Sequence, residues 1–242
     1  MSTERQTEAY YDDFSGWYER ERARGYHALV DELEVRAVAP LARGRRVLEV
    51  GCGTGLVLER LAPIAEAAYG VDLSAGMLRK ARERGLPVVQ GSVTALPFAD
   101  DSFDLVCSFK VLAHVHDIDR ALSELVRVTR PGGYLALEFY NPWSVRHVAK
   151  KIAGPQPISE GRSEADVFTR WDSPRRVRKL LPTNVELVDF RGVRVLTPAA
   201  FTHRIPGLRQ ALAWGERAAL TSPLRRFGGF LIAVARKQDQ RI

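Results

Sequence analysis

Cysteine is scarce in this sequence, which contains only Cys52 and Cys107 among 242 residues. The two lie far apart and show neither C-x-x-C nor cysteine–histidine spacing, which excludes a disulfide framework and argues against a zinc site. Long apolar runs are also missing, because no window approaches the roughly 18 to 20 apolar residues of a membrane span. No repeat is present, and no apolar segment follows Met1. We therefore expect a soluble, cytoplasmic protein.

Acidic residues are scarce in one part of the chain. Residues 1–140 carry 17 Lys and Arg against 21 Asp and Glu, a net charge of −4, whereas residues 141–242 carry 19 against 8, a net charge of +11. This basic excess fits an anionic partner, but it also fits solubility alone. The hydrophobic content of 45% allows a substantial core, and the length favours one α/β domain with additions.

Short apolar runs alternate with helical patterns. Strands are predicted at residues 45–50, 67–71, 87–90, 103–109, 134–140, 185–195 and 230–235. The first five alternate with helices, which predicts a doubly wound α/β fold, a parallel sheet with helices on both faces. In such sheets, ligands bind at the carboxyl ends of strands, near the point where the strand order reverses.

Helix boundaries follow from caps and breakers. A helix over 26–38 is expected to end at Pro40, and one after the first strand carries apolar residues at 56, 57, 61 and 64. Ser74 and Asp117 are predicted N-caps, and Ser173-Pro174 is predicted to start a further helix. The helix after Asp117 is expected to end at the Pro-Gly-Gly of residues 131–133.

Three glycines follow the first predicted strand in the stretch V-L-E-V-G-C-G-T-G, residues 47–55. Gly51, Gly53 and Gly55 have G-x-G-x-G spacing, which differs from the G-x-G-x-x-G of dinucleotide-binding folds. Glu49, two residues earlier, would repel a diphosphate but attract an ammonium group, while bare glycine backbone permits close approach.

Asp72 follows the second strand and suits a ribose diol, because its carboxylate can accept two hydrogen bonds. An ammonium group and a ribose occur together in S-adenosylmethionine. The acid-flanked glycine turn and Asp72 therefore predict this cofactor.

Four motifs, V-L-E-V-G-C-G-T-G, V-D-L-S-A-G-M-L, G-S-V-T-A-L-P-F-A-D-D-S-F-D-L-V and V-T-R-P-G-G-Y-L, resemble those of class I S-adenosylmethionine-dependent methyltransferases. The similarity covers residues 40–140 and is greatest to the small-molecule branch that includes the ubiquinone and menaquinone biosynthesis C-methyltransferases. It implies a doubly wound, seven-stranded, mostly parallel Rossmann-like sheet with a helical lid. Residues 1–40 would form an N-terminal helical cap, 41–140 the cofactor-binding core, and 141–242 lid insertions plus the last two strands.

The resemblance also implies roles for individual residues. Gly51, Cys52 and Gly53 would line the methionine part of the cofactor, with Glu49 at its amino group and Asp72 at the ribose. The adenine and the sulfonium would be bordered by Leu73, Met77, Ser92, Val93, Phe109 and Lys110. Ser92 departs from the family pattern, which commonly has Asp there. Tyr11 and Tyr18 in the leader would close over the cofactor or, alternatively, pin a terminal helix to the domain.

His114 is the candidate catalytic base, in V-L-A-H-V-H-D after the fourth strand, with His116 as a weaker alternative. A packing or capping role explains His114 equally well. Methyl transfer from a sulfonium is an in-line displacement, so a base is needed only if the acceptor must lose a proton.

The acceptor expected from this branch is a small or lipid-like molecule. A basic amphipathic helix near 208–219 leaves open a phospholipid or other phosphorylated acceptor, and peripheral contact with a membrane. A domain that binds the cofactor without transferring methyl, as a regulator, is a further alternative. Nucleic acid is disfavoured, because no RNA-binding module accompanies the basic residues. The oligomeric state stays open.

Overall fold

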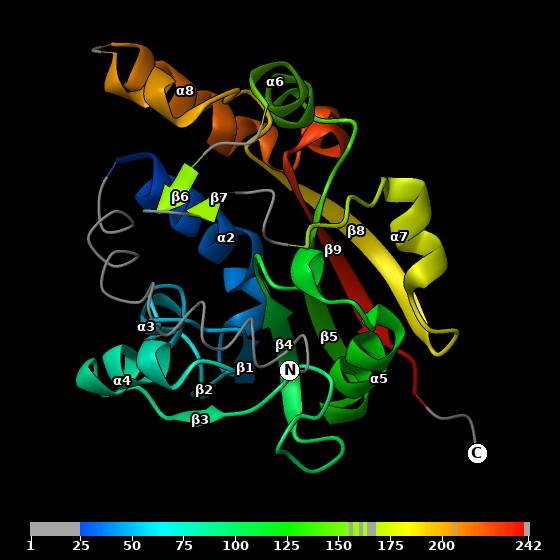
Figure 1. Ribbon diagram of the computed structural model, residues 1–242. Coiled ribbons are helices and arrows are strands. Elements are labelled where there is room, and N and C mark those ends of the chain that lie inside the picture. Colours follow the sequence, from blue (N-terminus) through cyan, green and yellow to red (C-terminus); the bar gives the residue numbers. More distant parts are fainter. Residues whose placement is uncertain (1–24, 155–156, 160–161, 164–167, 206, 240–242) are drawn as a thin grey trace.

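The computed structural model describes residues 25–154, 157–159, 162–163, 168–205 and 207–239. Within these ranges, seven strands form one sheet in the order β3-β2-β1-β4-β5-β9-β8 (Figure 1). The strands are β1 (Arg46–Val50), β2 (Ala67–Asp72), β3 (Val88–Gln90), β4 (Phe103–Ser108), β5 (Thr129–Tyr140), β8 (Val185–Val193) and β9 (Phe230–Lys237). A separate pair, β6 (Pro157–Ser159) and β7 (Arg162–Ser163), was not predicted.

The sheet is parallel from β3 to β5, whereas β9 runs antiparallel to both of its neighbours, β5 and β8. Because β1 pairs with β2 on one side and with β4 on the other, the strand order reverses at β1. The carboxyl ends of β1 and β4 therefore border the crevice where this architecture binds ligands. The predicted doubly wound, mostly parallel sheet is confirmed.

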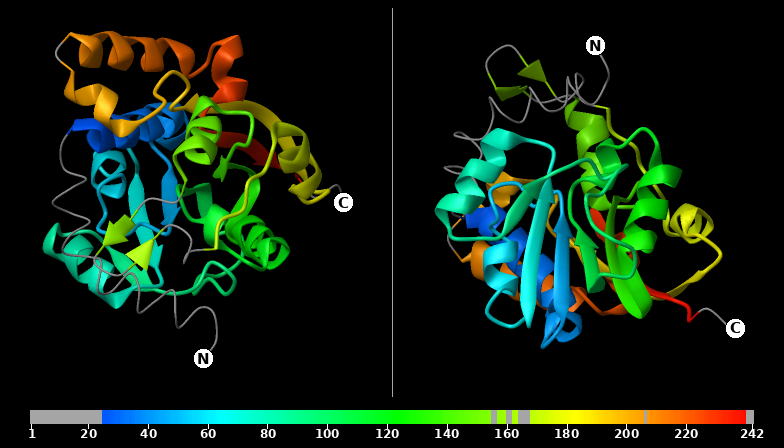
Figure 2. Two further views of the ribbon diagram at one scale, coloured as in Figure 1. Left: turned by 45° about the horizontal axis from the view of Figure 1, so that its top comes forward. Right: turned by 90° about the horizontal axis from the view of Figure 1, so that it is seen from below.

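Helices cover both faces of the sheet (Figure 2). The α-helices are α2 (Gly25–Ala42), α3 (Leu58–Leu61), α4 (Ala75–Glu83), α5 (Ile118–Val128), α6 (Val145–Ala153), α7 (Pro174–Leu180) and α8 (Leu208–Ala219). Short 3-10 helices are η1 (Leu112–His114), η3 (Ala200–Arg204) and η4 (Pro223–Phe227). Residues of α2, α3 and α4 join one apolar core cluster, and residues of α5 and α7 join the other.

Side-chain alternation along the strands decides which residues meet α2. In β1, Val47 belongs to the core cluster that contains α2, whereas Leu48 and Val50 belong to the opposite cluster. Since successive side chains of a strand point to opposite faces, Glu49 lies on the same face as Val47. The same alternation in β5 directs Glu138 to this face, because Leu137 and Phe139 belong to the opposite cluster. Two acids of the sheet thus face α2.

Three expected boundaries were wrong. Helix α2 does not end at Pro40 but continues to Ala42, since a proline in the last turn gives up one backbone hydrogen bond without ending the helix. The helix after the glycine turn is reduced to the four residues of α3. The Pro-Gly-Gly segment does not separate α5 from a later strand, because β5 begins at Thr129 and includes it.

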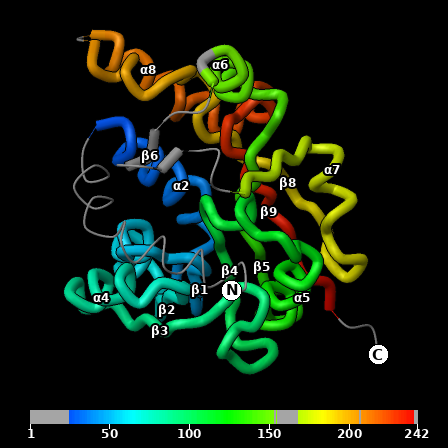
Figure 3. Tube along the Cα trace, viewed as in Figure 1, coloured from blue at the N-terminus to red at the C-terminus, as the bar shows by residue number. Residues whose placement is uncertain are grey.

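The two predicted caps and the predicted start of α7 are confirmed. The side chains of Ser74, Asp117 and Ser173 accept hydrogen bonds from the backbone N–H groups of Met77, Arg120 and Arg176, respectively. Figure 3 follows the chain from β5 through α6, α7, β8 and α8 to β9, the segment that departs from strand–helix alternation. No helix in the described ranges is long and apolar enough to span a bilayer.

Candidate functional site

The glycine turn joins the end of β1 to β2, because the N–H groups of Gly51 and Cys52 donate to the carbonyl of Val71 at 2.7 and 3.1 Å. All three glycines have positive φ, at 76°, 55° and 84°. A Cβ on Gly51 would overlap the Val111 side chain, so packing requires this glycine. A Cβ on Gly55 would likewise overlap the Leu86 side chain. A Cβ on Gly53 would meet nothing within 4 Å. Gly53 therefore leaves open space at the end of β1.

Asp72 holds the other side of this turn. Its Oδ2 accepts the Gly53 N–H at 2.8 Å, and its Oδ1 accepts the Ser74 N–H at 2.9 Å. The carboxylate is thereby fixed at the carboxyl end of β2, beside the open face of Gly53. Met77, one turn into α4, is buried at 2% exposure, and Leu73 is half-buried.

A cavity of about 30 Å³, enough for one or two water molecules, lies next to the turn. Its lining combines predicted cofactor-binding residues with residues of α2: Asp31, Glu34, Glu49, Gly51, Cys52, Thr54, Leu56, Val57, Phe109 and Lys110. The structure thus brings Glu49, Gly51, Cys52, Phe109 and Lys110 together at one place.

Four buried carboxyl groups gather at this cavity or beside it. Asp31 and Glu34 come from α2, Glu49 from β1 and Glu138 from β5, and each is at most 3% exposed. We call these four residues the acidic cluster. Sequence reasoning identified Glu49 but missed the other three. The available signals were a lone acid in the apolar run L-A-L-E-F-Y of β5, and two acids three positions apart in α2.

Lys110 lies inside the acidic cluster. Its Nζ is 2.6 Å from the Glu34 carboxylate and 3.2 Å from Asp31, and its backbone N–H donates to Glu138 Oε1 at 3.1 Å. The residue has φ of 60°, the left-handed region that a side chain other than glycine seldom adopts. This strain turns the chain after β4 so that the ammonium group reaches the carboxylates of α2.

Burial dominates the ionisation of Glu49 and Glu138. It raises the pKa of Glu49 well above its ordinary value, and the neighbouring Glu34 raises it further. Burial likewise raises the pKa of Glu138, and the neighbouring Glu34 raises it further. Oε2 of each residue has no hydrogen-bond partner within the described ranges. A buried carboxyl oxygen without a partner costs free energy, so a cationic group bound here would be stabilising.

The site predicted for the adenine is built without an acid. Ser92 and Val93 are half-buried, and the Ser92 hydroxyl lies 2.8 Å from Thr94 Oγ1 and accepts the Thr94 N–H at 3.2 Å. The hydroxyl therefore organises its own turn. A neutral hydroxyl therefore stands where the resemblance implied an aspartate.

His114 is oriented by the backbone. Its Nδ1 lies 2.8 Å from the carbonyl oxygen of Phe168, which can only accept, so Nδ1 carries the proton and Nε2 carries the lone pair. Nε2 faces the Tyr140 hydroxyl at 3.4 Å. Burial lowers the pKa of His114, which keeps the ring neutral near pH 7.

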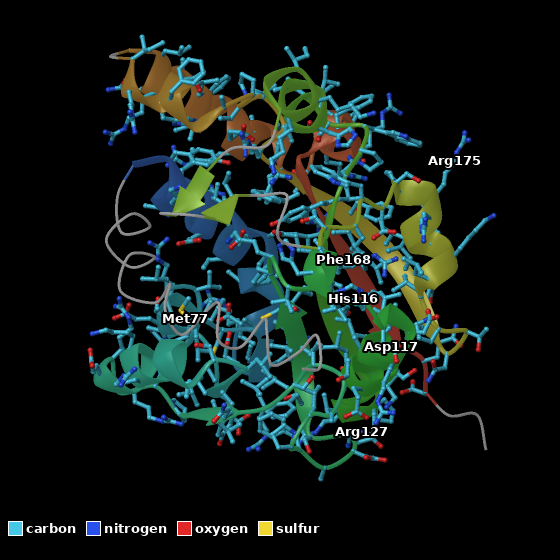
Figure 4. The ribbon with its side chains drawn as sticks, in the orientation of Figure 1. Met77, His116, Asp117, Arg127, Phe168 and Arg175 are labelled. Atoms are coloured by element: carbon cyan, nitrogen blue, oxygen red, sulfur yellow. The ribbon has the colours of Figure 1, made fainter. Side chains whose placement is uncertain are left out.

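His116 is placed differently. It is exposed and stacks on Phe168, with ring centroids 3.9 Å apart (Figure 4). Tyr11 and Tyr18 lie outside the described residues, so their expected contacts with the cofactor stay predictions.

Comparison with known proteins finds a matching domain and similar sequences. Residues 48–137 match the model of the methyltransferase domain. A demethylmenaquinone methyltransferase from Mycobacterium sp. strain KMS is 42% identical over 110 residues, which are 45% of this chain and 48% of that protein. The corresponding enzyme from Thermobifida fusca is 43% identical over 101 residues, 39% of this chain and 43% of that protein. The matched segment thus spans about half the length of these curated relatives.

Solved structures agree on the fold along nearly the whole chain. A methyltransferase from Thermotoga maritima, described as a possible histamine N-methyltransferase, has a TM-score of 0.69 at 23% identity and covers 94% of this chain and 98% of its own. The 4+2 cyclase SpnF has a TM-score of 0.70 at 21% identity, with 98% of both chains covered. These likenesses concern the fold alone.

The matched domain, the strand order and the acid-flanked glycine turn agree with one another. Residues 48–137 thus match the methyltransferase domain and are similar to the demethylmenaquinone methyltransferases, and nearly the whole chain shares the fold of a solved S-adenosylmethionine-dependent methyltransferase.

Proposed function

We propose that this protein transfers the methyl group of S-adenosylmethionine to a small-molecule acceptor with a quinol-like ring, the class that the names of its relatives indicate. The observation that carries the proposal is the carboxyl edge of β1 and β2. There a buried carboxyl group with an oxygen lacking a partner within the described ranges, a bare glycine and a second acid lie together.

Each of these features fits one part of the cofactor. Glu49 would receive the ammonium group, because its Oε2 lacks a hydrogen-bond partner in the described part of the chain. The open face of Gly53 would allow the nucleoside to approach the backbone, beside Cys52 and Gly51. Asp72 would hold the ribose hydroxyls, since each carboxylate oxygen can accept a second hydrogen bond.

The remaining cofactor contacts are proposed by position. Leu73 and Met77 would pack near the adenine, with Ser92 and Val93 at its edge. Backbone of Phe109 and Lys110 would border the sulfonium. Apolar side chains and backbone in these places leave adenine recognition to shape and weak polar contacts.

S-adenosylmethionine supplies an electrophilic methyl group, and the protein aligns and desolvates the acceptor. His114 would accept the acceptor's proton, because its Nδ1–H is engaged by the Phe168 carbonyl and its neutral Nε2 has a lone pair. Tyr140, in front of Nε2, would relay this proton or yield its place to the acceptor's hydroxyl group.

Calorimetry with S-adenosylhomocysteine tests the cofactor assignment. We expect saturable binding to the full chain and at least a tenfold loss in Asp72→Ala, which removes two charge-assisted hydrogen bonds of the turn. The control is Asp119→Ala, an exposed acid of the first turn of α5. Binding of a nicotinamide dinucleotide in place of S-adenosylhomocysteine would overturn the proposal.

Mass spectrometry of a cell extract incubated with the protein and a deuterated methyl donor tests the reaction. The expected result is a labelled product with a quinol-like ring. S-adenosylhomocysteine binding without any labelled product would instead support a regulator that binds the cofactor, and a labelled phospholipid would support the phosphorylated-acceptor alternative.

Peripheral membrane contact, which would give access to a lipid-like acceptor, is supported by exposed apolar side chains on η3 and α8. Trp214 is 75% exposed and Phe201 is 62% exposed. Exposed cations at Arg204 and Arg209 lie in the same segment. An aromatic side chain beside cations is typical of helices that rest on anionic lipid surfaces.

Vesicle flotation tests this contact. We expect the protein to float with phosphatidylglycerol vesicles, and less of it with Trp214→Ser. The matched control is Trp143→Ser, which changes another exposed tryptophan outside this segment. Equal flotation with neutral and anionic vesicles would contradict the proposal.

A further inference from the structure

Arg146, at the start of α6, is a buried cation inside an aromatic cage. Its guanidinium carbon lies 4.5 Å from the ring centroid of Tyr140, 4.7 Å from Phe230 and 5.1 Å from Trp171. The residue is 7% exposed. Three rings from β5, β9 and the segment before α7 therefore surround one charge, and we call these four residues the arginine cage.

Two of the three nitrogens of this guanidinium have no hydrogen-bond partner within the described ranges. These are Nε and Nη1, and both are buried. Aromatic faces attract a cation, but they do not replace the hydrogen bonds that two buried N–H groups lose on leaving water. The arginine cage thus carries an electrostatic cost that an anionic ligand would relieve.

No carboxylate of the described residues forms an ion pair with Arg146, and the buried acids Glu216 and Asp172 have other partners. Glu216 accepts the backbone N–H groups of residues 195, 196 and 197 at 2.8 to 3.0 Å. Asp172 binds Arg170 and Arg176. Burial lowers the pKa of Arg194, and the positive charge of the neighbouring Arg146 lowers it further.

Tyr26, at the start of α2, adds a third unused donor. Its hydroxyl is buried without a hydrogen-bond partner in the described part of the chain, and burial raises its pKa to about 12. The hydroxyl therefore stays protonated and can donate. The positive charges of Arg194 and Arg146 lower this pKa, but by less than burial raises it.

The arginine cage adjoins the candidate base through Tyr140. One face of the Tyr140 ring carries Arg146, and the hydroxyl of the same residue faces His114 Nε2 at 3.4 Å. Burial lowers the pKa of His114, and the positive charge of Arg146 lowers it further. A group that gives up its proton to His114 would therefore leave its negative charge close to the positive charge of Arg146. Proton acceptor and counter-cation are thus arranged around one aromatic ring.

We propose that Arg146, assisted by the Tyr26 hydroxyl, binds the anionic oxygen of the acceptor, which is a planar aromatic compound bound as its phenolate or enolate. A flat ring suits the aromatic walls, and a delocalised oxyanion suits the two guanidinium N–H groups. The inference rests on the proposed function, because it assigns the acceptor of that same reaction.

Binding of two naphthoquinone probes to the full chain, saturated with S-adenosylhomocysteine, tests the proposal. Lawsone carries a hydroxyl that is ionised near pH 7, and its O-methyl ether has the same ring without the charge. We expect the wild type to bind lawsone at least tenfold more tightly than the ether, as one or two charge-assisted hydrogen bonds would give. Quenching of tryptophan fluorescence provides the measurement.

Variants separate recognition from folding. Arg146→Gln should bring the lawsone-to-ether ratio close to one, and Arg146→Lys should retain part of it. The matched control is Arg175→Gln, since Arg175 also lies over an aromatic ring, that of Trp143 at 5.9 Å, but on an exposed helix (Figure 4). Tyr26→Phe, which keeps the ring, should lower lawsone affinity severalfold and remains informative if the Arg146 variants do not fold.

The outcomes distinguish the two proposals. S-adenosylhomocysteine binding with equal affinity of the wild type for both probes, or with neither probe bound, would overturn the acceptor assignment and leave the proposed function in place. A preference for lawsone that survives both Arg146→Gln and Tyr26→Phe would show that the arginine cage is structural. Failure to bind S-adenosylhomocysteine would remove the proposed function itself.

Discussion

The acidic cluster and the arginine cage are both largely buried but carry opposite charge. The acidic cluster gathers four carboxyl groups from α2, β1 and β5 around Lys110. The arginine cage surrounds one guanidinium with rings and leaves two of its donors without partners in the described residues. Glu138 and Tyr140 are two positions apart on β5, so one strand contributes to both.

The difference teaches how one small domain can bring together a cation and an anion. A cationic methyl donor would be favoured beside the Glu49 oxygen that lacks a partner in the described residues, and an anionic acceptor would be favoured beside the two unpartnered nitrogens of Arg146. Each region would then be neutralised by its own ligand. Substitutions in one region at a time, and one at a position distant from both, test this comparison.

Removal of the lysine should have the largest effect. Lys110→Met takes the cation away from Asp31 and Glu34 and should cost about 3–5 kcal/mol of stability near pH 8. The loss should shrink in acid, where the carboxylates become protonated. Urea unfolding measures it, with Lys80→Met as the control, since Lys80 pairs with Glu83 on the surface and should cost less than about 1 kcal/mol. Equal costs for the two variants would contradict a buried ionic cluster.

Neutralising one acid should stabilise the protein. The pKa of Glu138 is raised above 4.5 in the folded state, so its contribution to stability is present below that ordinary value and is lost as the pH rises through the folded pKa. Glu138→Gln cannot lose a proton and should be more stable than the wild type by roughly 1–2 kcal/mol near pH 8. Thermal unfolding should show the gain vanish near pH 4.5. A destabilised variant near pH 8 would refute this account.

Glu49→Gln should affect the ligand more than the fold. Because burial raises the pKa of Glu49, binding of an ammonium group beside it should release a proton from Glu49 to solvent. The affinity for S-adenosylhomocysteine should therefore increase as the pH rises toward that pKa. The variant should bind about tenfold more weakly above this pH and show a flatter pH profile. Calorimetry in buffers of different ionisation enthalpy measures the released proton, and proton release that persists in the variant would count against Glu49.

The smallest effect is expected outside both regions. Asp117→Ala removes the cap of α5, whose side chain accepts the Arg120 N–H at 3.1 Å, and should cost about 1 kcal/mol. Neither S-adenosylhomocysteine nor lawsone should bind differently. A change in either affinity would mean that a loss of stability alone weakens ligand binding. The affinities of the other variants would then have to be corrected for their loss of stability.

Local patterns predicted most of the fold. The apolar positions of α5, its Asp117 cap and the Ser74 cap are short-range signals, and each appears at its predicted place. The length of α3 was overestimated, since four apolar positions fit a helix that the glycine turn and Pro63 shorten to one turn. The end of α2 was misjudged because a proline in the final turn is tolerated.

Site residues that are close together in the sequence were predicted, and those that are far apart in the sequence were missed. Glu49, Gly53 and Asp72 lie within 24 positions of one another in motifs, and the structure brings them together. The contacts of Lys110 with α2 join residues 76 and 79 positions apart, which no local pattern reveals. The arginine cage needs rings from three distant segments, so Arg146 was indistinguishable from the other cations of residues 141–242.

The position of β9 determines the order in which the two regions can be assembled during synthesis. The turn with Glu49, Gly53 and Asp72 needs strands that are complete once β4 and β5 have formed. Phe230, one wall of the arginine cage, begins β9, which comes after every other strand of the sheet and connects β8 to β5. A nascent chain on the ribosome could therefore complete the glycine turn while the arginine cage still lacks Phe230.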